Sequence, residues 1–286
     1  MKLALIGKGG AGKTMICVVL INLLQKYKKV IAIDADSNKN LIDYIFNDKI
    51  EEKSELGELR EEIFKKSEVS KSSYERKYFP KNGIGVFELN QNDKVFQKTA
   101  YQKENISLIQ LGEPKEKRVG VTGMCPYNET MKVFLSNLKD NDKEIVLVDF
   151  AAGSEASTKG IIASFDNLII PLEPNLKNID VTKDIFKTLK LINFKNVFFI
   201  LNKVRSEKDI EFIKSEFGQD IQIIGIIPFS KELMKMDIKK EIDLENKIIK
   251  NNFSPIIENI LKMGIDKEKL ERLKNLDDLK LGKKCH

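Results

Sequence analysis

Apolar residues fall in short runs of Val, Ile, Leu and Phe, separated by stretches that have a helical period. The runs cover residues 3–6, 30–33, 106–111, 145–148, 168–171, 197–201 and 221–226. Such continuous runs are typical of strands that are buried on both faces and pair in parallel. Helical stretches lie between several of them, at residues 13–26, 129–138, 179–191 and 207–217. This order predicts an α/β fold, a mostly parallel sheet with helices on both faces.

Two parts of the chain depart from this alternation. Residues from 48 to about 104 are rich in Lys, Glu, Ser and Asn, with a helical pattern only around residues 56–65. We interpret them as an excursion of helix and loops, with a turn at Gly83 and Gly85. Beyond residue 241 the pattern is helical through Lys262, and a further helix is expected from residue 266 to about 281. We therefore expect one domain over residues 1–262, followed by a C-terminal helix and tail over residues 263–286.

The composition narrows the classes of protein that are compatible with this chain. Its 49 basic and 43 acidic residues give a net charge of +6, so the surface mixes both signs and no basic nucleic-acid surface is indicated. No apolar run approaches the roughly 20 residues of a membrane span, and residues 3–6 are too short for a signal peptide. With only Cys17, Cys125 and Cys285, a disulfide framework is excluded. A cytoplasmic protein is expected.

The only histidine is the terminal His286, which excludes an imidazole general base within the fold. The chemistry must therefore use lysines, carboxylates, backbone amides and a metal ion carried by the substrate.

Residues 7–14, Gly-Lys-Gly-Gly-Ala-Gly-Lys-Thr, match the phosphate-binding pattern GxxxxGK[ST] between a predicted strand and a predicted helix. Lys13 is expected to reach the β and γ phosphates, and Thr14 to offer its hydroxyl to Mg²⁺. Phosphate oxygens should meet the successive backbone amides of the loop and the helix N-terminus. The amides assigned to the ligand belong to Gly9, Gly10, Ala11, Gly12, Lys13 and Thr14. The pattern predicts a P-loop NTPase.

Carboxylates follow two of the predicted strands at the edge where ligands bind in parallel sheets. Asp34 and Asp36 follow the strand at residues 30–33, and Asp149 follows the strand at residues 145–148. Asp149 is expected to hold Mg²⁺, and Asp34 is expected to help order the coordination shell of that ion. Gly153 is expected to donate a backbone amide to the γ-phosphate. The alternative for Asp34 and Asp36 is that they only cap the next helix.

With its additional lysine at position 8, the pattern GKGGxGKT resembles the deviant P-loop ATPases, the group that contains ParA, MinD and the nitrogenase iron protein. The resemblance implies a slow ATPase with ATP and Mg²⁺, which works as an ATP-dependent homodimer. It implies that Lys8 crosses the dimer interface to the partner's nucleotide. It also implies that Asp36 positions or activates the attacking water.

Asn202-Lys203-Val204 and Pro228-Phe229 each follow a predicted strand and resemble the adenine-binding stretches of the same group. The resemblance implies that the Asn202 amide contacts the base edge and that the backbone from Pro228 to Ser230 lies beside the base. Ordinary loop capping by these residues is the alternative.

Several further segments are similar to the CooC type, ATPases that assist nickel insertion into carbon monoxide dehydrogenase. They are Leu111-Gly112, residues 123–128, residues 149–155 and Ile227-Pro228-Phe229 with Asp237. The resemblance covers residues 1–262 and implies a client metalloenzyme. That family places a Cys-x-Cys pair before a proline, whereas this chain has Gly123 and Cys125 before Pro126. Two thiolates per dimer replace four, so Cys125 either binds Ni²⁺ or Zn²⁺ weakly at the dimer interface or is an inert residue at a helix start.

Two other functions compete with maturation. A positioning ATPase of the ParA or MinD kind would bind DNA or membrane, with the leucines of residues 270–281 as the candidate anchor. That segment lacks aromatic residues and interleaves acidic with basic ones, so we expect it to pack on its own domain. We accordingly expect no nucleic-acid or membrane partner. An electron donor like the iron protein would need two cluster cysteines per protomer.

Overall fold

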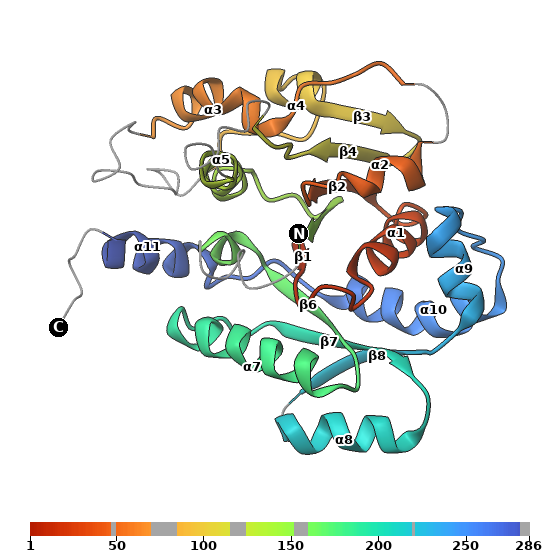
Figure 1. Cartoon of the computed structure of the whole chain (residues 1–286). Helices are drawn as coiled ribbons and strands as arrows, with labels where there is room; N and C mark the ends of the chain where they lie inside the picture. Colours follow the sequence, from red (N-terminus) through yellow and green to blue (C-terminus); the bar gives the residue numbers. More distant parts are fainter. Residues whose placement is uncertain (47–49, 70–84, 115–123, 152–159, 219–220, 281–286) are drawn as a thin grey trace.

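The computed structural model describes residues 1–46, 50–69, 85–114, 124–151, 160–218 and 221–280, which form an eight-stranded sheet with helices around it (Figure 1). The strands are β1 Lys2–Leu5, β2 Lys29–Ala35, β3 Ala100–Lys103, β4 Ile106–Gln110, β5 Glu144–Phe150, β6 Asn167–Leu172, β7 Val197–Val204 and β8 Gln222–Pro228. Their order across the sheet is β3-β4-β2-β5-β1-β6-β7-β8, and only β3 is antiparallel to its neighbour. All seven predicted strands are present, and the prediction of a mostly parallel α/β fold is confirmed.

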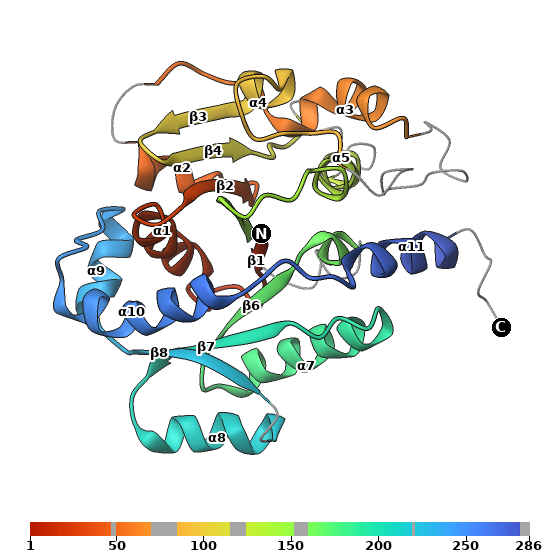
Figure 2. The ribbon, with the colours of Figure 1, turned by 180° about the vertical axis from the view of Figure 1, so that it is seen from behind.

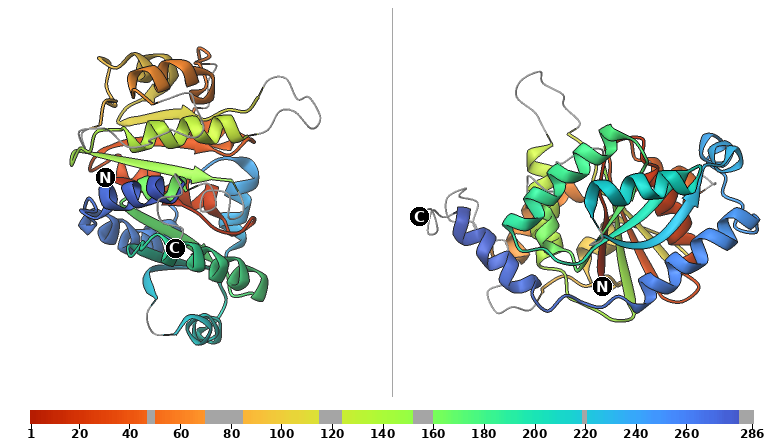
Figure 3. Two further views of the ribbon diagram at one scale, coloured as in Figure 1. Left: turned by 90° about the vertical axis from the view of Figure 1, so that its left-hand side faces the viewer. Right: turned by 90° about the horizontal axis from the view of Figure 1, so that it is seen from below.

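Successive side chains along each strand point to opposite faces of the sheet and pack into two separate hydrophobic cores. Ala4 and Ile6 face one core, whereas Leu3 and Leu5 face the other. The first core is covered by η1 Leu56–Leu59, α3 Arg60–Lys66, α4 Lys94–Thr99, α5 Cys125–Ser136, η2 Ile161–Ser164, α7 Leu176–Leu191 and α8 Glu207–Phe217. The second is covered by α1 Lys13–Leu24, α2 Asn40–Ile45, α9 Lys231–Lys239 and α10 Lys247–Lys262. Figures 2 and 3 show these helices on the two sides of the sheet.

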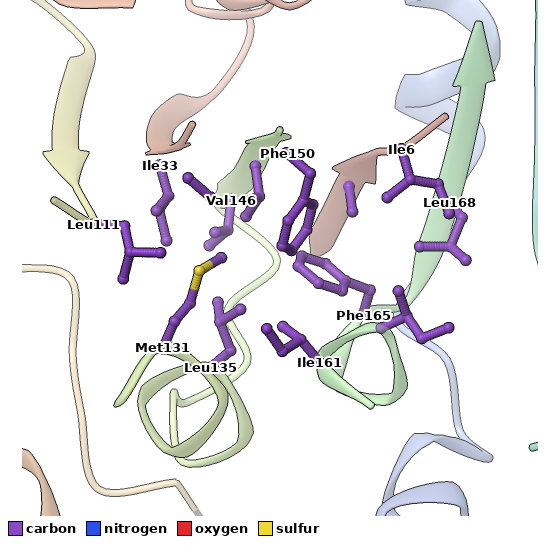
Figure 4. Packing of buried hydrophobic residues seen from close by; sticks show 14 of the residues in the cluster. Ile6, Ile33, Leu111, Met131, Leu135, Val146, Phe150, Ile161, Phe165 and Leu168 are labelled. Carbon is purple, nitrogen blue, oxygen red and sulfur yellow. The ribbon is translucent and has the colours of Figure 1, made fainter. Parts of the chain in front are cut away.

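The first core closes tightly under the end of β5. Figure 4 shows Met131 and Leu135 of α5 pointing at the strands, with Ile161 beside them. Phe150 at the end of β5 meets Phe165 edge to face, with ring centroids 5.8 Å apart. Such aromatic pairs add about 0.5–1.5 kcal/mol beyond the area that they bury. The strand end that carries Asp149 therefore rests on a rigid base.

The structure differs from the sequence-based expectations at three places. β3 lies in the stretch assigned to helix and loops, and it pairs with β4 across the two-residue turn Glu104-Asn105. Helix α5 begins at Cys125, four residues before the predicted helical stretch at residues 129–138, because Pro126 is tolerated in a first turn. Helix α9 was not predicted, although Ser230 caps it by accepting from Glu232 N and Leu233 N.

Charged residues fasten the last helix, α11 Lys269–Lys280, to the first core. Lys269 Nζ donates to Asp166 Oδ1 at 2.7 Å, and Arg272 Nη2 donates to the Phe165 carbonyl at 2.7 Å. The expectation that this helix packs on its own chain is confirmed for its first turns. Within the described residues, no helix has both the length and the apolar character to span a bilayer. Of the predicted turn glycines, Gly83 lies outside the described residues.

Candidate nucleotide-binding site

The glycine-rich loop joins β1 to α1 in a shape that its glycines permit. Gly10 and Gly12 have φ angles of 81° and 83°, in the left-handed region that side chains rarely adopt. A Cβ at Gly12 would also lie 2.5 Å from Asn202 Nδ2. Gly12 directly precedes α1, so the loop leads into a helix N-terminus, where backbone amides lack partners within the helix.

Side chains bind each of the carbonyls from Gly7 to Ala11. Lys13 Nζ donates to the Gly7 and Lys8 carbonyls at 3.2 Å, and Lys8 Nζ donates to the Gly9 carbonyl at 3.1 Å. Lys203 Nζ donates to the Gly10 carbonyl at 2.7 Å, and Asn202 Nδ2 to the Ala11 carbonyl at 2.8 Å. Because C=O and the following N–H point in opposite directions across a planar peptide, fixing these carbonyls also fixes the amides.

Among the described residues, the buried ammonium of Lys13 has only carbonyl oxygens as hydrogen-bond partners. Lys13 is 7% exposed, and burial lowers its pKa. Asp149 and Asp36 attract its charge from a distance. A phosphate would offer this ammonium a charged acceptor, and hydrogen bonds to charged groups are about twice as strong as neutral ones.

Two carboxylates lie side by side next to this loop. Asp34 and Asp149 are register partners in the parallel strands β2 and β5, and each is 1% exposed. Burial raises the pKa of Asp149 to about 7, and Asp34 adds to the rise, whereas a hydrogen bond from Thr14 opposes it. Burial also raises the pKa of Asp34 to about 6. Two buried carboxylates at one point favour either protons or a cation.

Asp149 keeps an acceptor that fits a metal ion. Its Oδ1 is buried and has no hydrogen-bond partner among the described residues. The Thr14 hydroxyl lies near enough to the same carboxylate to lower its pKa, so the two expected Mg²⁺ ligands are adjacent. Carboxylate and hydroxyl oxygens are the hard donors that Mg²⁺ prefers. These residues therefore fit the ion.

Asp34 has a different environment from Asp149. Its Oδ1 accepts from Asp36 N at 3.1 Å, and its Oδ2 accepts from Leu41 N in α2 at 2.9 Å. The carboxylate thus shapes the β2–α2 loop and caps α2, as the capping interpretation supposed. A role beside Mg²⁺ remains a prediction. Asp36 lies half-buried on that loop and accepts from the backbone and side chain of Asn38.

A bulge in β7 brings Asn202 and Lys203 to the loop. The pairing of β7 with β8 shifts between Asn202 and Val204, and Lys203 between them has a φ of 58°. The additional residue of a bulge redirects side chains, often beside functional sites. Asn202 Oδ1 accepts from Lys203 N at 2.9 Å while its Nδ2 binds Ala11, and Lys203 also pairs with Glu173 at 2.5 Å. Contact of Asn202 with a base stays a prediction.

A pocket of about 530 Å³ opens over the loop. The predicted site residues that line it are Gly9, Gly10, Gly12, Lys13, Thr14, Asp36, Asn202, Lys203, Pro228 and Phe229. Lys8 and Ala11 of the loop, and Asp34 and Asp149 at the strand ends, do not line the pocket, and Gly153 lies outside the described residues. The wall also includes Ser230, whose backbone was expected beside the base, and Asp237, which the sequence named only as part of a resemblance. Residues to which the sequence assigned no role complete the wall: Met15, Asn40, Tyr44, Leu233, Met234 and Ile238. The Ser230 cap and the apolar spacing of residues 233 and 236 were the signal for that part of the wall.

Cys125 is not in the pocket wall. It is exposed at the first residue of α5. Within the described ranges, no three His, Cys, Asp or Glu side chains are grouped as metal ligands. Gly123, Cys285 and His286 lie outside those ranges.

The chain is similar to known nucleotide-binding proteins along most of its length. Residues 3–244 match the family described as the CobQ/CobB/MinD/ParA nucleotide binding domain. An uncharacterized ATP-binding protein of Methanocaldococcus jannaschii is 31% identical over 258 residues, which cover 87% of this chain and 94% of that protein. The carbon monoxide dehydrogenase accessory protein CooC of Rhodospirillum rubrum is 28% identical over 242 residues, 83% of this chain and 87% of CooC.

Solved structures share the fold at lower identity. MinD of Pyrococcus horikoshii in complex with Mg-ADP superposes with a TM-score of 0.61 at 16% identity, covering 91% of this chain and 96% of MinD. A plasmid partition protein of Borrelia burgdorferi bound to AMPPNP gives 0.59 at 17% identity, covering 91% and 98%. The P-loop NTPase fold expected from residues 7–14 is thereby confirmed.

The two raised carboxyl pKa values predict an inverse dependence of stability on pH. Because the folded nucleotide-free protein holds more protons than the unfolded chain above about pH 3.9, its free energy of unfolding should fall as pH rises from 5 to 8. Asp149→Asn should flatten this slope and melt at a higher temperature than the unmodified protein at pH 8. Thermal denaturation across this range measures both, with exposed Asp142→Asn as the control. An unchanged slope in Asp149→Asn would contradict the assignment.

Proposed function

Because the chain belongs to the CobQ/CobB/MinD/ParA family of nucleotide-binding domains, we propose that it binds ATP with Mg²⁺ and hydrolyses it as a slow dimeric switch. The observation that carries the proposal is the adjacency of Lys13, Thr14 and the unpartnered Oδ1 of buried Asp149. Lys13 offers an ammonium group to the phosphates, and Thr14 and Asp149 offer oxygen atoms to the Mg²⁺ that accompanies them. ATP-binding relatives and structural neighbours that hold AMPPNP or Mg-ADP support the choice of ligand.

Each part of the site has a role in this reaction. The amides from Gly9 to Thr14 bind phosphate oxygens, and Lys13 exchanges its two carbonyls for the β and γ phosphates. Thr14 and Asp149 hold Mg²⁺, which neutralises phosphate charge when bound. Asp36, on the loop beside the pocket, orients the attacking water and accepts its proton. Gly153 donates its amide to the γ-phosphate.

The part of the pocket wall around Pro228 and Phe229 suits a nucleobase. Pro228, Phe229 and Leu233 give it apolar surface, and Asn202 gives it an amide. A base that packs between apolar walls is positioned by a few polar groups, as is usual for small-ligand pockets. Asn202 and Lys203 also bind the loop, so they join the base end to the phosphate end.

The dimer is proposed from Lys8. Its side chain is half-buried, and within the part of the chain that the structure describes it bonds only to the neighbouring Gly9 carbonyl, a contact that it can exchange for a phosphate of the partner's nucleotide. Removal of the γ-phosphate would weaken that contact and let the dimer open, which gives the two states that a switch requires.

The cargo of the switch is proposed to be a metalloenzyme or its metal, as for the CooC relative. Cys125 is exposed at the start of α5 and is the thiol that a dimer would have to share. A positioning role on DNA or membrane is the competing function, and co-sedimentation with either in the presence of ATP would favour it, above all if binding weakens with salt.

Lys13→Ala should abolish turnover and weaken ATP binding by roughly 100-fold, because each charged hydrogen bond contributes about 1.5–3 kcal/mol. Calorimetry with Mg-ATP and phosphate release measure the two effects. Exposed Lys26→Ala, which removes the same charge near the end of α1, should bind ATP normally. Undiminished turnover of Lys13→Ala would refute the assignment of the loop.

Asp36→Ala should bind ATP, hydrolyse it at least about 10-fold more slowly, and accumulate as a closed dimer, because the water loses its orienting carboxylate.

Lys8→Ala should bind ATP yet stay monomeric. Gel filtration with light scattering, with and without ATP, distinguishes the two variants. An unchanged dimer of Lys8→Ala would count against a contact across the interface.

About one Ni²⁺ or Zn²⁺ per dimer should bind in the presence of ATP, and Cys125→Ser should remove it, because thiolates are the suitable ligands for these ions. Elemental analysis of protein purified anaerobically measures this, with Cys285→Ser as the control thiol. If ATP closes the dimer and no metal binds, the cargo is a protein and the metal role of Cys125 is wrong.

A further inference from the structure

One hydrogen bond joins two walls of the pocket that are distant in sequence. The Tyr44 hydroxyl in α2 donates to Asp237 Oδ1 in α9 at 2.6 Å, and it also lies 3.0 Å from the Asp237 carbonyl. Both residues line the pocket. An ion pair between Asp43 and Lys240 lies next to this bond, with side chains about half exposed, where such pairs contribute little.

Each helix in this contact continues directly into one end of the site. Helix α2 begins four residues after Asp36, and its Leu41 amide is held by Asp34 below the loop. Helix α9 starts at the cap Ser230, directly after Pro228 and Phe229 in the wall that suits a base. Tyr44 therefore connects the segment of the water-positioning carboxylate with the segment beside the base.

The Tyr44 hydroxyl keeps its proton and therefore remains the donor of this hydrogen bond at neutral pH. Burial raises the pKa of Tyr44, and the Asp237 carboxylate raises it further, so the phenol stays protonated and remains a donor at neutral pH. A hydroxyl that donates to a carboxylate at this distance makes a charge-assisted hydrogen bond, with Tyr44 half-buried and Asp237 exposed to solvent. The other end of α2 is fixed by buried Asp34, so α2 is held at both ends and the Asp36 loop lies against the first of these anchors.

We propose that Tyr44 and Asp237 form a latch that couples the base end of the pocket to Asp36. A seated base fixes α9, and the latch then holds α2 and the Asp36 loop in the arrangement for hydrolysis. Both are positioning residues, because they act on the reaction through Asp36. The inference rests on the proposed ATPase function and concerns how that site senses an intact nucleotide.

The test compares ATP with ribose 5-triphosphate, which carries the same phosphates and no base. The unmodified protein should have a higher kcat for ATP than for ribose 5-triphosphate. Tyr44→Phe and Asp237→Ala should reduce this ratio by about 10-fold, the equivalent of 1.4 kcal/mol, chiefly through kcat for ATP and with KM changed less. Asp237→Asn keeps an acceptor oxygen and should retain most of the ratio. Tyr27→Phe removes an exposed hydroxyl elsewhere and is the matched control.

A second measurement does not depend on turnover. Hydrogen exchange of the α2 amides should slow when AMPPNP binds to the unmodified protein, and it should slow less in Tyr44→Phe at full occupancy. An unchanged rate ratio in Tyr44→Phe, an effect confined to KM, or equal loss in Asp237→Asn and Asp237→Ala would overturn the latch. Absence of ATP hydrolysis by the unmodified protein would instead contradict the proposed function, and the exchange experiment would still decide on the latch.

Discussion

The burial of Asp34 beside Asp149 is the constraint on which the rest of the site depends. Their strands are neighbours in the sheet, and their positions are in register. A parallel sheet with β1 next to β5 then brings the glycine loop to the same edge, so Thr14 reaches Asp149. Ionisation of either carboxyl group costs free energy there unless a cation is present, because both groups are out of contact with water. The core under β5 keeps the pair together through Phe150 and Phe165.

The two carboxylates divide the work of the site between them. Asp34 is fully used by backbone amides and gives the β2–α2 loop its shape. Asp149 keeps one oxygen without a partner among the described residues. The arrangement thus combines a carboxylate that holds backbone with a carboxylate that has an oxygen available for the proposed metal ion. Removing the first would disturb the path of the chain through Asp36, whereas removing the second would leave that path in place.

The sequence was sufficient for those parts of the site that are contiguous or lie at strand ends. Residues 7–14 specify their own geometry, and the apolar runs before Asp34, Asp149 and Asn202 place these residues at one edge. It was not sufficient for β3, whose four residues have no apolar run and gain their place from pairing with β4. It was also insufficient for Tyr44 and Asp237, which are 193 positions apart and meet only because α2 and α9 cover the same core.

The lysine ammonium groups that now bond to carbonyls of the glycine loop would exchange these carbonyls for phosphate oxygens when a nucleotide binds. Two of the three cations that hold these carbonyls, on Lys8 and Lys13, are the ones proposed to bind phosphate, whereas Lys203 and Asn202 can keep their bonds. Little conformational entropy is lost when the ligand arrives, since the loop is already ordered by its own side chains. The same bonds compete with the ligand, so affinity reflects a difference between two sets of contacts. A ligand gains from this difference only as far as it offers the displaced ammonium groups better acceptors than the carbonyls that they leave.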